Sequence, residues 1–213
     1  MKNTWIISIF AALSILFSYN AQSTLLLSNG DEVLSLSTES DIVFDIQGGQ
    51  LVGAFNVNVN GTFYDVAFQD GSFIDIFGGT TGLDARTVTQ SLIFSTALDA
   101  FVFVDNNAGL FDTDSTLTFG CNSSRACSVY TPYDIAGINV FFSTVDNFNG
   151  SAADSIRFSA ENTLRDSSLF GTFTYANWQL TQVRLDSTPV PEPSSIVLCL
   201  FGILGLVAKR KKI

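Results

Sequence analysis

The pair Asn60-Gly61 is the feature that most constrains the fold, because it separates two stretches in which apolar and polar residues alternate. Asn-Gly is the preferred pair for a two-residue type I′ turn, and such a turn joins neighbouring antiparallel strands. Closing the turn there places the apolar residues of both strands on one face, so the turn and the alternation agree on register. The expected cross-strand pairs are Val59–Thr62, Val57–Tyr64 and Phe55–Val66.

The sequence FQDGSFIDIF, which follows the second strand, offers two ways to turn again. A two-residue turn at Asp70-Gly71 would set Val66 against Asp75, an apolar residue against a charged one. A three-residue loop over 70–72 gives apolar pairs instead, Phe68–Ile74 and Val66–Ile76. The pattern therefore favours the longer loop and predicts a three-stranded antiparallel meander.

A helical period of apolar residues begins after Thr87, in the segment TVTQSLIFSTALDAFVFVDNNAG. Thr87 and Gln90 fit a capping box, and the polar residues from Asp105 to Gly109 are typical of a helix end. β-Branched residues and phenylalanines in the segment favour a strand, which is the alternative. The prediction is a helix near 88–104 with its apolar positions at Ile93, Ala97, Ala100, Phe101 and Val104.

Further strands are predicted at STLTF, GINVFFSTV, SIRFSA and GTFTYANWQLTQVRL, which Asn, Gly, Asp and Ser separate. Packing the helix on the apolar face of a sheet would remove phenylalanine side chains from water, and this is the main driving force available. The sequence therefore predicts an α+β fold, in which a mainly antiparallel sheet of hairpins and a meander packs with one helix.

The 20 Phe and 46% hydrophobic residues of this 213-residue chain can supply the core of one domain of about 165 residues. Residues 24 to 188 contain five Arg, no Lys and 19 acidic residues, a net charge of −14. Such a surface repels phosphate backbones, which excludes nucleic acid as a partner. It suits a soluble exported domain or one that attracts cations.

Residues 1–23 have the pattern of a secretory signal peptide. Lys2 is the positive start, and the run from Trp5 to Phe17 is apolar. Ala21-Gln22-Ser23 provides the small residues that signal peptidase prefers, so we expect cleavage near Ser23 or, alternatively, after Ala21. An uncleaved N-terminal anchor is the other interpretation, although the run is short for a membrane span.

The C-terminus contains an uncharged run of 13 residues, Ile196 to Ala208. A helix of that length covers roughly 20 Å against a hydrocarbon core of about 30 Å, so the run predicts a short transmembrane helix. By the positive-inside rule, the basic cluster that follows stays in the cytoplasm and leaves the acidic domain across the membrane. This cluster consists of Lys209, Arg210, Lys211 and Lys212.

Pro191, Glu192 and Pro193 precede this run, and the prolines keep their segment extended. The order of Pro-Glu-Pro, short apolar helix and basic cluster resembles the PEP-CTERM sorting signal, a tail also labelled the C-terminal domain of ice-binding proteins. The resemblance implies export by a Gram-negative bacterium that makes extracellular polysaccharide, and recognition of Pro191, Glu192 and Pro193 by an exosortase. The ice-binding label describes a tail shared by unrelated proteins and implies nothing about ice.

These segments divide the chain into a signal peptide (1–23), an exported acidic β-rich domain (24–187) and a sorting and anchor segment (188–213). The domain also resembles a group of PEP-CTERM proteins of uncharacterised activity in VNVNGTFYDVAFQDGSF, AGLFDTDSTLTFGCNSS and TPYDIAG. That resemblance implies a common fold and supplies no activity.

Cys121 and Cys127 stand close together in the polar segment GCNSSRACS. In an oxidising compartment such a pair predicts a disulfide. A metal site is the weaker interpretation, because two thiolates without histidine lack partners. Cys199 lies in the apolar tail and is expected to be a small apolar residue there.

The chain contains no histidine, which excludes Ser-His-Asp and Cys-His nucleophilic sites and the usual zinc ligand sets. Schiff-base and Ser-Lys schemes have no lysine within the exported domain, and no glycine-rich phosphate loop precedes a lysine. Carboxylates remain, but no pair stands out as the two that a glycosidase needs. We therefore predict no catalytic site, no bound cofactor and no metal site.

Two groups of residues each allow a binding role and a purely structural one. The segment from Asp105 to Ser115 gathers oxygen ligands that suit Ca²⁺, although it departs from the EF-hand pattern, and a solvated loop that ends the helix is the alternative. Four aromatic residues are able to stack on sugars if they are exposed and otherwise belong to the core: Tyr130, Tyr133, Tyr175 and Trp178.

Taken together, the sequence predicts a non-enzymatic exported protein with a structural or binding role at the cell surface or in the extracellular polysaccharide matrix. Signal peptidase and an exosortase would process it, and the C-terminal helix would hold it in the membrane transiently. The alternatives are a secreted carbohydrate-active hydrolase that uses paired carboxylates, and a Ca²⁺-dependent matrix adhesin.

Overall fold

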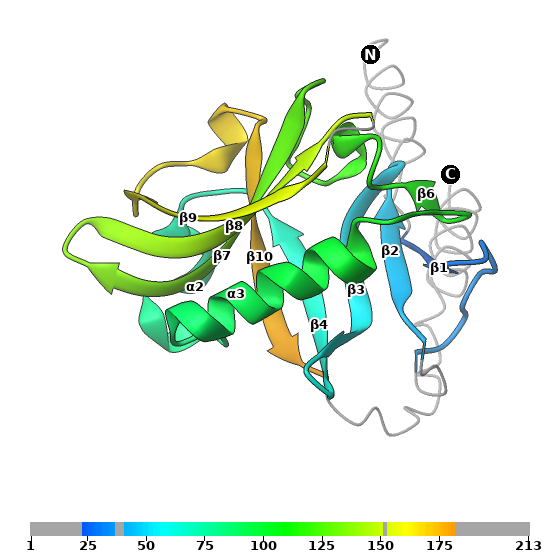
Figure 1. Ribbon diagram of the computed structural model, residues 1–213, viewed down its shortest axis with the longest axis horizontal. Helices are drawn as coiled ribbons and strands as arrows, with labels where there is room; N and C mark the ends of the chain where they lie inside the picture. The colour runs from blue at the N-terminus through cyan, green and yellow to red at the C-terminus, as the bar shows by residue number, and fades with distance from the viewer. Residues whose placement is uncertain (1–22, 37–40, 151–152, 182–213) are drawn as a thin grey trace, which may run out of the picture. The chain divides into compact units, whose positions relative to one another are not determined.

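A computed structural model describes residues 23–36, 41–150 and 153–181 (Figure 1). The expected signal peptide, apart from its last residue, lies outside the described residues. So do the expected sorting motif, the transmembrane helix and the basic cluster.

Within the described residues, eight strands form one sheet in the order β1-β2-β3-β4-β10-β7-β8-β9. Their bounds are β1 Thr24–Leu27, β2 Val43–Gln47, β3 Gln50–Val59, β4 Thr62–Gln69, β7 Ala126–Ala136, β8 Asn139–Phe148, β9 Ser155–Asn162 and β10 Phe173–Leu180. All neighbours are antiparallel except β10 and β7, which run parallel. The prediction of a mainly antiparallel sheet is confirmed, and the parallel pair was not predicted.

The remaining elements are short, apart from one helix. They are β5 Asp105–Asn106, β6 Gly109–Leu110, α2 Phe73–Phe77, α3 Val88–Ala97, the π-helix η3 Leu98–Val102, and the 3-10 turns η2 Thr80–Gly82, η4 Ser115–Leu117 and η5 Ser167–Leu169. Figure 1 shows α3 lying across one face of the sheet, as predicted for the helix near 88–104.

The predicted hairpin forms, and its turn residues Asn60 and Gly61 both have positive φ, 52° and 85°. Val57 pairs with Tyr64 and Val59 with Thr62, as expected. The predicted pairing of Phe55 with Val66 is wrong, because Ala54 takes that position after a register shift. Asn56 has a φ of 59° and forms a β-bulge, which inserts a residue that the alternation does not reveal.

The prediction of a third meander strand is wrong, because its residues form the helix α2. Ser72 caps this helix by accepting the N–H of Asp75 at 3.3 Å, and Gly78 ends it with a φ of 64°. Phe73 and Phe77, one turn apart, stack with ring centroids 5.1 Å apart and are buried. Helical caps at both ends therefore outweigh the alternation, and β10 takes the place beside β4.

Helix α3 begins at the predicted cap, where Thr87 accepts the N–H of Gln90 at 3.2 Å. The Gln90 side chain accepts the N–H of Arg86 rather than that of Thr87, so the capping box is only half formed. The helical region ends at Val102, two residues earlier than expected.

The predicted apolar face of the helix is confirmed in part. Ala97 is buried, and Ile93 and Val104 are partly buried against the core, whereas Ala100 and Phe101 are exposed. The other buried residues of the helical region were not predicted: Ser91, Phe94, Ser95, Leu98 and Val102. The helix is apolar on both sides, so periodicity alone does not decide which side is buried. Buried serines decide it, because Ser91 Oγ donates to the carbonyl of Thr131 at 2.7 Å and accepts the N–H of Ser143 at 3.0 Å.

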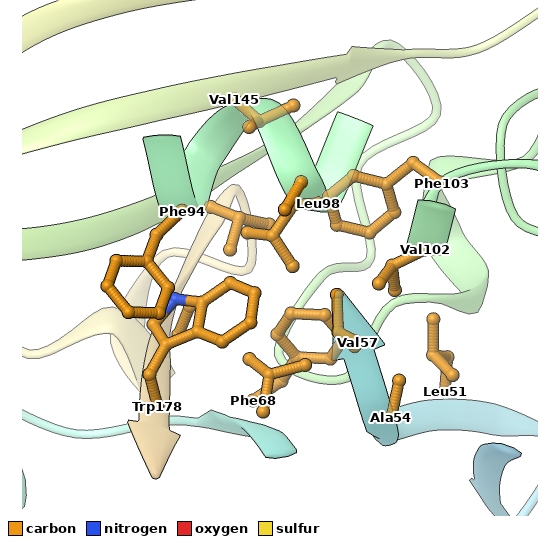
Figure 2. Packing of buried hydrophobic residues seen from close by; sticks show 14 of the residues in the cluster. Leu51, Ala54, Val57, Phe68, Phe94, Leu98, Val102, Phe103, Val145 and Trp178 are labelled. Atoms are coloured by element: carbon orange, nitrogen blue, oxygen red, sulfur yellow. The ribbon is translucent and has the colours of Figure 1, made fainter. Parts of the chain in front are cut away.

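The sheet carries an apolar core on each face. On the α3 face, Phe94 and Leu98 pack with Trp178, Phe68 and Val57 (Figure 2). On the other face, α2 packs on a second cluster formed by Phe73, Phe77, Tyr130, Phe142, Phe173 and Tyr175. This second cluster covers the β10, β7 and β8 part of its face.

Downstream predictions have mixed outcomes. GINVFFSTV and SIRFSA form β8 and β9, and the described part of the last predicted strand forms β10. STLTF is wrong as a strand, because Asp114 caps a 3-10 turn there by accepting the N–H of Thr116. Strand β7 was not predicted, and it contains Pro132, a residue type that usually interrupts strands. The strand accommodates Pro132 because its register shifts between Pro132 and Asp134.

Candidate functional site

The predicted disulfide is present between Cys121 and Cys127, with Cα atoms 5.7 Å apart. Both residues are buried in the core on the α3 face, and Cys127 belongs to β7. The N–H of Asn122 also donates to the carbonyl of Gly171 at 2.8 Å. The bridge therefore fastens the loop after η4 to the central part of the sheet.

Three of the four aromatic residues considered for sugar stacking belong to the cores. Tyr130, Tyr175 and Trp178 are all at most 7% exposed, and the Trp178 indole donates to the Thr131 hydroxyl at 3.4 Å. Tyr133 is half-buried against the core on the α3 face. A sugar-binding role for the three buried rings is therefore excluded in this conformation.

The loop from Asp105 to Ser115 bonds to itself. Asp105 accepts the backbone N–H groups of Asp112 and Thr113, each at 3.0 Å, and the Thr113 hydroxyl at 2.8 Å. These hydrogen bonds outweigh slight burial and lower the pKa of Asp105. Within the described ranges, no group of three or more Cys, Asp or Glu side chains is placed to hold a metal ion.

A polar hollow of about 140 Å³ lies on the sheet face opposite α3, beyond the part that α2 covers. Its nine lining residues come from four neighbouring strands, β2, β3, β4 and β10: Asp45, Val52, Gly53, Phe55, Asp65, Val66, Ala67, Asn177 and Gln179. The register explains how they meet. Asp45 pairs with Gly53, Gly53 with Ala67 and Ala67 with Asn177, so small residues form the floor between polar ones.

Gly53 is required at the floor of the polar hollow. A Cβ atom there would lie 2.4 Å from the carbonyl oxygen of Val66, closer than real contacts allow. The same strand, β3, bulges at Asn56, whose N–H donates to Asp65 Oδ1 at 3.2 Å. Close backbone approach and the bulge together aim the Asp65 carboxylate at the hollow.

Neighbouring groups hold the polar side chains of the hollow in place. Asp65 also accepts the hydroxyl of Thr181 at 2.8 Å. The Asn177 amide donates to Gln69 Oε1 at 3.2 Å. The hollow thus presents fixed carboxylate and amide groups together with one aromatic ring, Phe55.

The carboxyl group with the largest rise in pKa lies elsewhere. Burial raises the pKa of Asp154, just before β9, to about 6. Burial also raises the pKa values of Asp70, Asp84 and Asp99, none of which lines the polar hollow.

Sequence reasoning did not find Asp45 and Asp65 as a pair, because topology brings them together. One available signal was the outward position of Asp65 in the hairpin, between the inward Tyr64 and Val66. The partners from β2 and β10 had no such signal.

A second concavity, the apolar groove, lies between α3 and the tip of the β3–β4 hairpin and has a volume of about 460 Å³. Its walls include Asn58 and Asn60 from the hairpin and Leu92, Ile93, Ala100 and Phe101 from α3 and η3. Three of these helical residues are ones that the sequence analysis assigned to the core.

None of the helices in the described part of the chain combines the length and the apolar character that a membrane span needs.

Comparison with known proteins finds a match at the C-terminus of the chain. Residues 189–212 match the family model of the PEP-CTERM protein-sorting motif, which includes Pro191, Glu192 and Pro193. No curated protein and no solved structure matches the chain. The motif implies export, processing by an exosortase and transient association of the tail with the membrane. The chain therefore carries a PEP-CTERM protein-sorting motif at residues 189–212.

Proposed function

We propose that this protein is a non-catalytic component of the cell surface or extracellular matrix, and that its polar hollow binds extracellular polysaccharide. The observation that carries the proposal is the composition of the hollow. Four polar side chains line the hollow, those of Asp45, Asp65, Asn177 and Gln179. The aromatic ring of Phe55 and the apolar residues Val52, Val66 and Ala67 line it as well.

This combination matches the chemistry of a sugar ring. Sugar hydroxyls donate hydrogen bonds to carboxylates, and side-chain amides both donate and accept. The apolar C–H face of a pyranose packs on an aromatic ring such as Phe55. The net charge of −14 between residues 24 and 188 disfavours an acidic polymer, so the proposed ligand is a neutral polysaccharide.

The presence of two carboxylates in one hollow also favours a second candidate, a glycoside hydrolase that uses Asp45 and Asp65. Hydrolysis requires one carboxyl to stay protonated as the general acid. Binding needs only the hydrogen-bonding and aromatic groups that line the hollow, whereas cleavage also needs one carboxyl to act as the general acid. Binding is therefore the first proposal and cleavage the second.

The test is affinity electrophoresis of the exported protein through gels that contain neutral polysaccharide from the producing cell. Retardation is expected for the wild type, and about ten-fold weaker binding for Asp45→Ala and for Phe55→Ala, since each removes a direct contact. Asp134→Ala, which changes an exposed acid on β7, is the matched control and should bind like the wild type.

Release of reducing ends from the same polysaccharide distinguishes the two candidates. New reducing ends that disappear in Asp45→Asn and Asp65→Asn would replace the binding proposal with the hydrolase. Equal retardation of wild type, Asp45→Ala and Phe55→Ala would remove the hollow as the polysaccharide site.

A further inference from the structure

The apolar groove lies on the opposite face of the sheet from the polar hollow, and the function proposed above does not use it. From its volume, lining and charge, we infer that it is a second binding site, for a small neutral molecule with an apolar body and a hydrogen-bond acceptor at one end. The volume of about 460 Å³ falls within the range of small-molecule pockets, roughly 300–1,000 Å³.

A surface helix is usually polar on its outer side, whereas the helical wall of the groove is apolar except for Thr96. The Thr96 hydroxyl donates to the carbonyl of Leu92 at 2.9 Å. The buried side of α3 already packs on the sheet through Phe94 and Leu98. On the groove side, Leu92 is 37% exposed and Phe101 is 44% exposed. Packing within the domain therefore does not account for this second apolar side.

The end of the helix widens into the π-helix η3 at the groove. The N–H of Phe103 donates to the carbonyl of Leu98 at 2.9 Å, one residue further back than in an α-helix. This extra residue keeps Val102 and Phe103 in the core while Ala100 and Phe101 line the groove. Single π-turns are rare and frequently stand at functional sites, which is an observation independent of the apolar lining.

Charge and rim chemistry define the class of ligand. Among the described residues, none that lines the groove is charged, although the domain as a whole is strongly acidic. An anion is therefore repelled, and a cation meets no counter-charge within the groove. At the hairpin tip, Asn58 uses its Oδ1 to accept the N–H of Gly61 at 2.7 Å, which leaves its NH₂ group to donate. The ligand therefore places its acceptor, such as a carbonyl oxygen, against Asn58.

The test uses Nile red, a neutral apolar dye with a carbonyl group, titrated into the exported protein without detergent. Saturable binding with one dye per chain is expected. Ala100→Trp fills the groove from an exposed helical position and should weaken binding by about ten-fold, and Phe101→Gln should act in the same direction. Leu164→Trp is the matched control, because Leu164 is 72% exposed and lies outside the groove.

Three outcomes would overturn the inference. The first is dye binding that does not saturate or that survives Ala100→Trp and Phe101→Gln in correctly folded protein. The second is equal binding of the anionic dye anilinonaphthalene sulfonate. The third is a concentration-dependent dimer in sedimentation that Phe101→Asp dissociates, because a second copy would then occupy the groove. Asp45→Ala should leave dye binding unchanged, so failure here and failure of polysaccharide binding are separate results.

Discussion

Asp154 illustrates how much a single side chain depends on its surroundings. Burial raises its pKa from 3.8 to about 6, the charges of Asp112, Asp99 and Asp146 act in the same direction, and the N–H of Phe148 opposes them by donating to it at 2.9 Å. The folded protein therefore binds this proton more tightly than the unfolded chain does. The free energy of unfolding therefore falls as pH rises from about 4 to about 6. Above that range the buried carboxylate is fully charged and its destabilising effect is complete.

We therefore expect Asp154→Asn to stabilise the protein at pH 7.5 and to have little effect at pH 4. A shift of this size corresponds to about 3 kcal/mol, which partial exposure to solvent reduces to about 1 kcal/mol. Urea unfolding at the two pH values measures the difference. Asp134→Asn changes an exposed residue and serves as the control; an equal gain for Asp154→Asn at both pH values would contradict the assignment.

At the scale of elements, the contact between α3 and the sheet depends on buried hydroxyl groups. Ser143 of β8 donates through Oγ to the carbonyl of Ser91 at 2.7 Å, and its Oγ lies 2.5 Å from that of Ser95. All three serines are fully buried. Their small size allows the helix backbone to approach the strand closely, and their hydrogen bonds fix which side of the helix faces it.

Ser143→Ala should lower the free energy of unfolding by about 1–3 kcal/mol, because it leaves buried polar groups on α3 without a partner. Ser124→Ala, at an exposed position in the loop between the two cysteines, is the control and should change stability by less than about 0.5 kcal/mol. Denaturant unfolding measures both. A loss at Ser143 no larger than that at Ser124 would show that the hydroxyls do not hold the helix.

The same scale shows what the sequence can reveal. The Asn60-Gly61 turn and the Thr87 cap are local signals, and both were predicted. The bulge at Asn56 and the helix that begins after Ser72 were missed, because each interrupts the alternation with a hydrogen bond from a backbone N–H to a side chain. Counting apolar periods does not detect such a bond. The polar hollow could not be predicted, because its residues meet only after β10 has been placed between β4 and β7.

At the scale of the whole molecule, the Cys121–Cys127 bridge ties the loop after η4 to β7. Because the residues are only six apart, loop-closure entropy predicts a contribution of about 2 kcal/mol. Reduction should therefore lower the free energy of unfolding by about that amount. The measurement is urea unfolding with and without reductant, and Cys121→Ser/Cys127→Ser serves as the control, since reductant should not affect it. An unchanged midpoint for the wild type would contradict the prediction.

Strand β10 lies between the β1–β4 half of the sheet and the β7–β9 half, although it comes last in sequence among the described strands. An exported chain that crosses the membrane N-terminus first cannot hydrogen-bond these halves into one sheet until Leu180 has emerged. The sorting motif begins only a few residues later, at 189. The domain is therefore able to complete its sheet at nearly the same stage of translocation at which the sorting motif reaches the membrane.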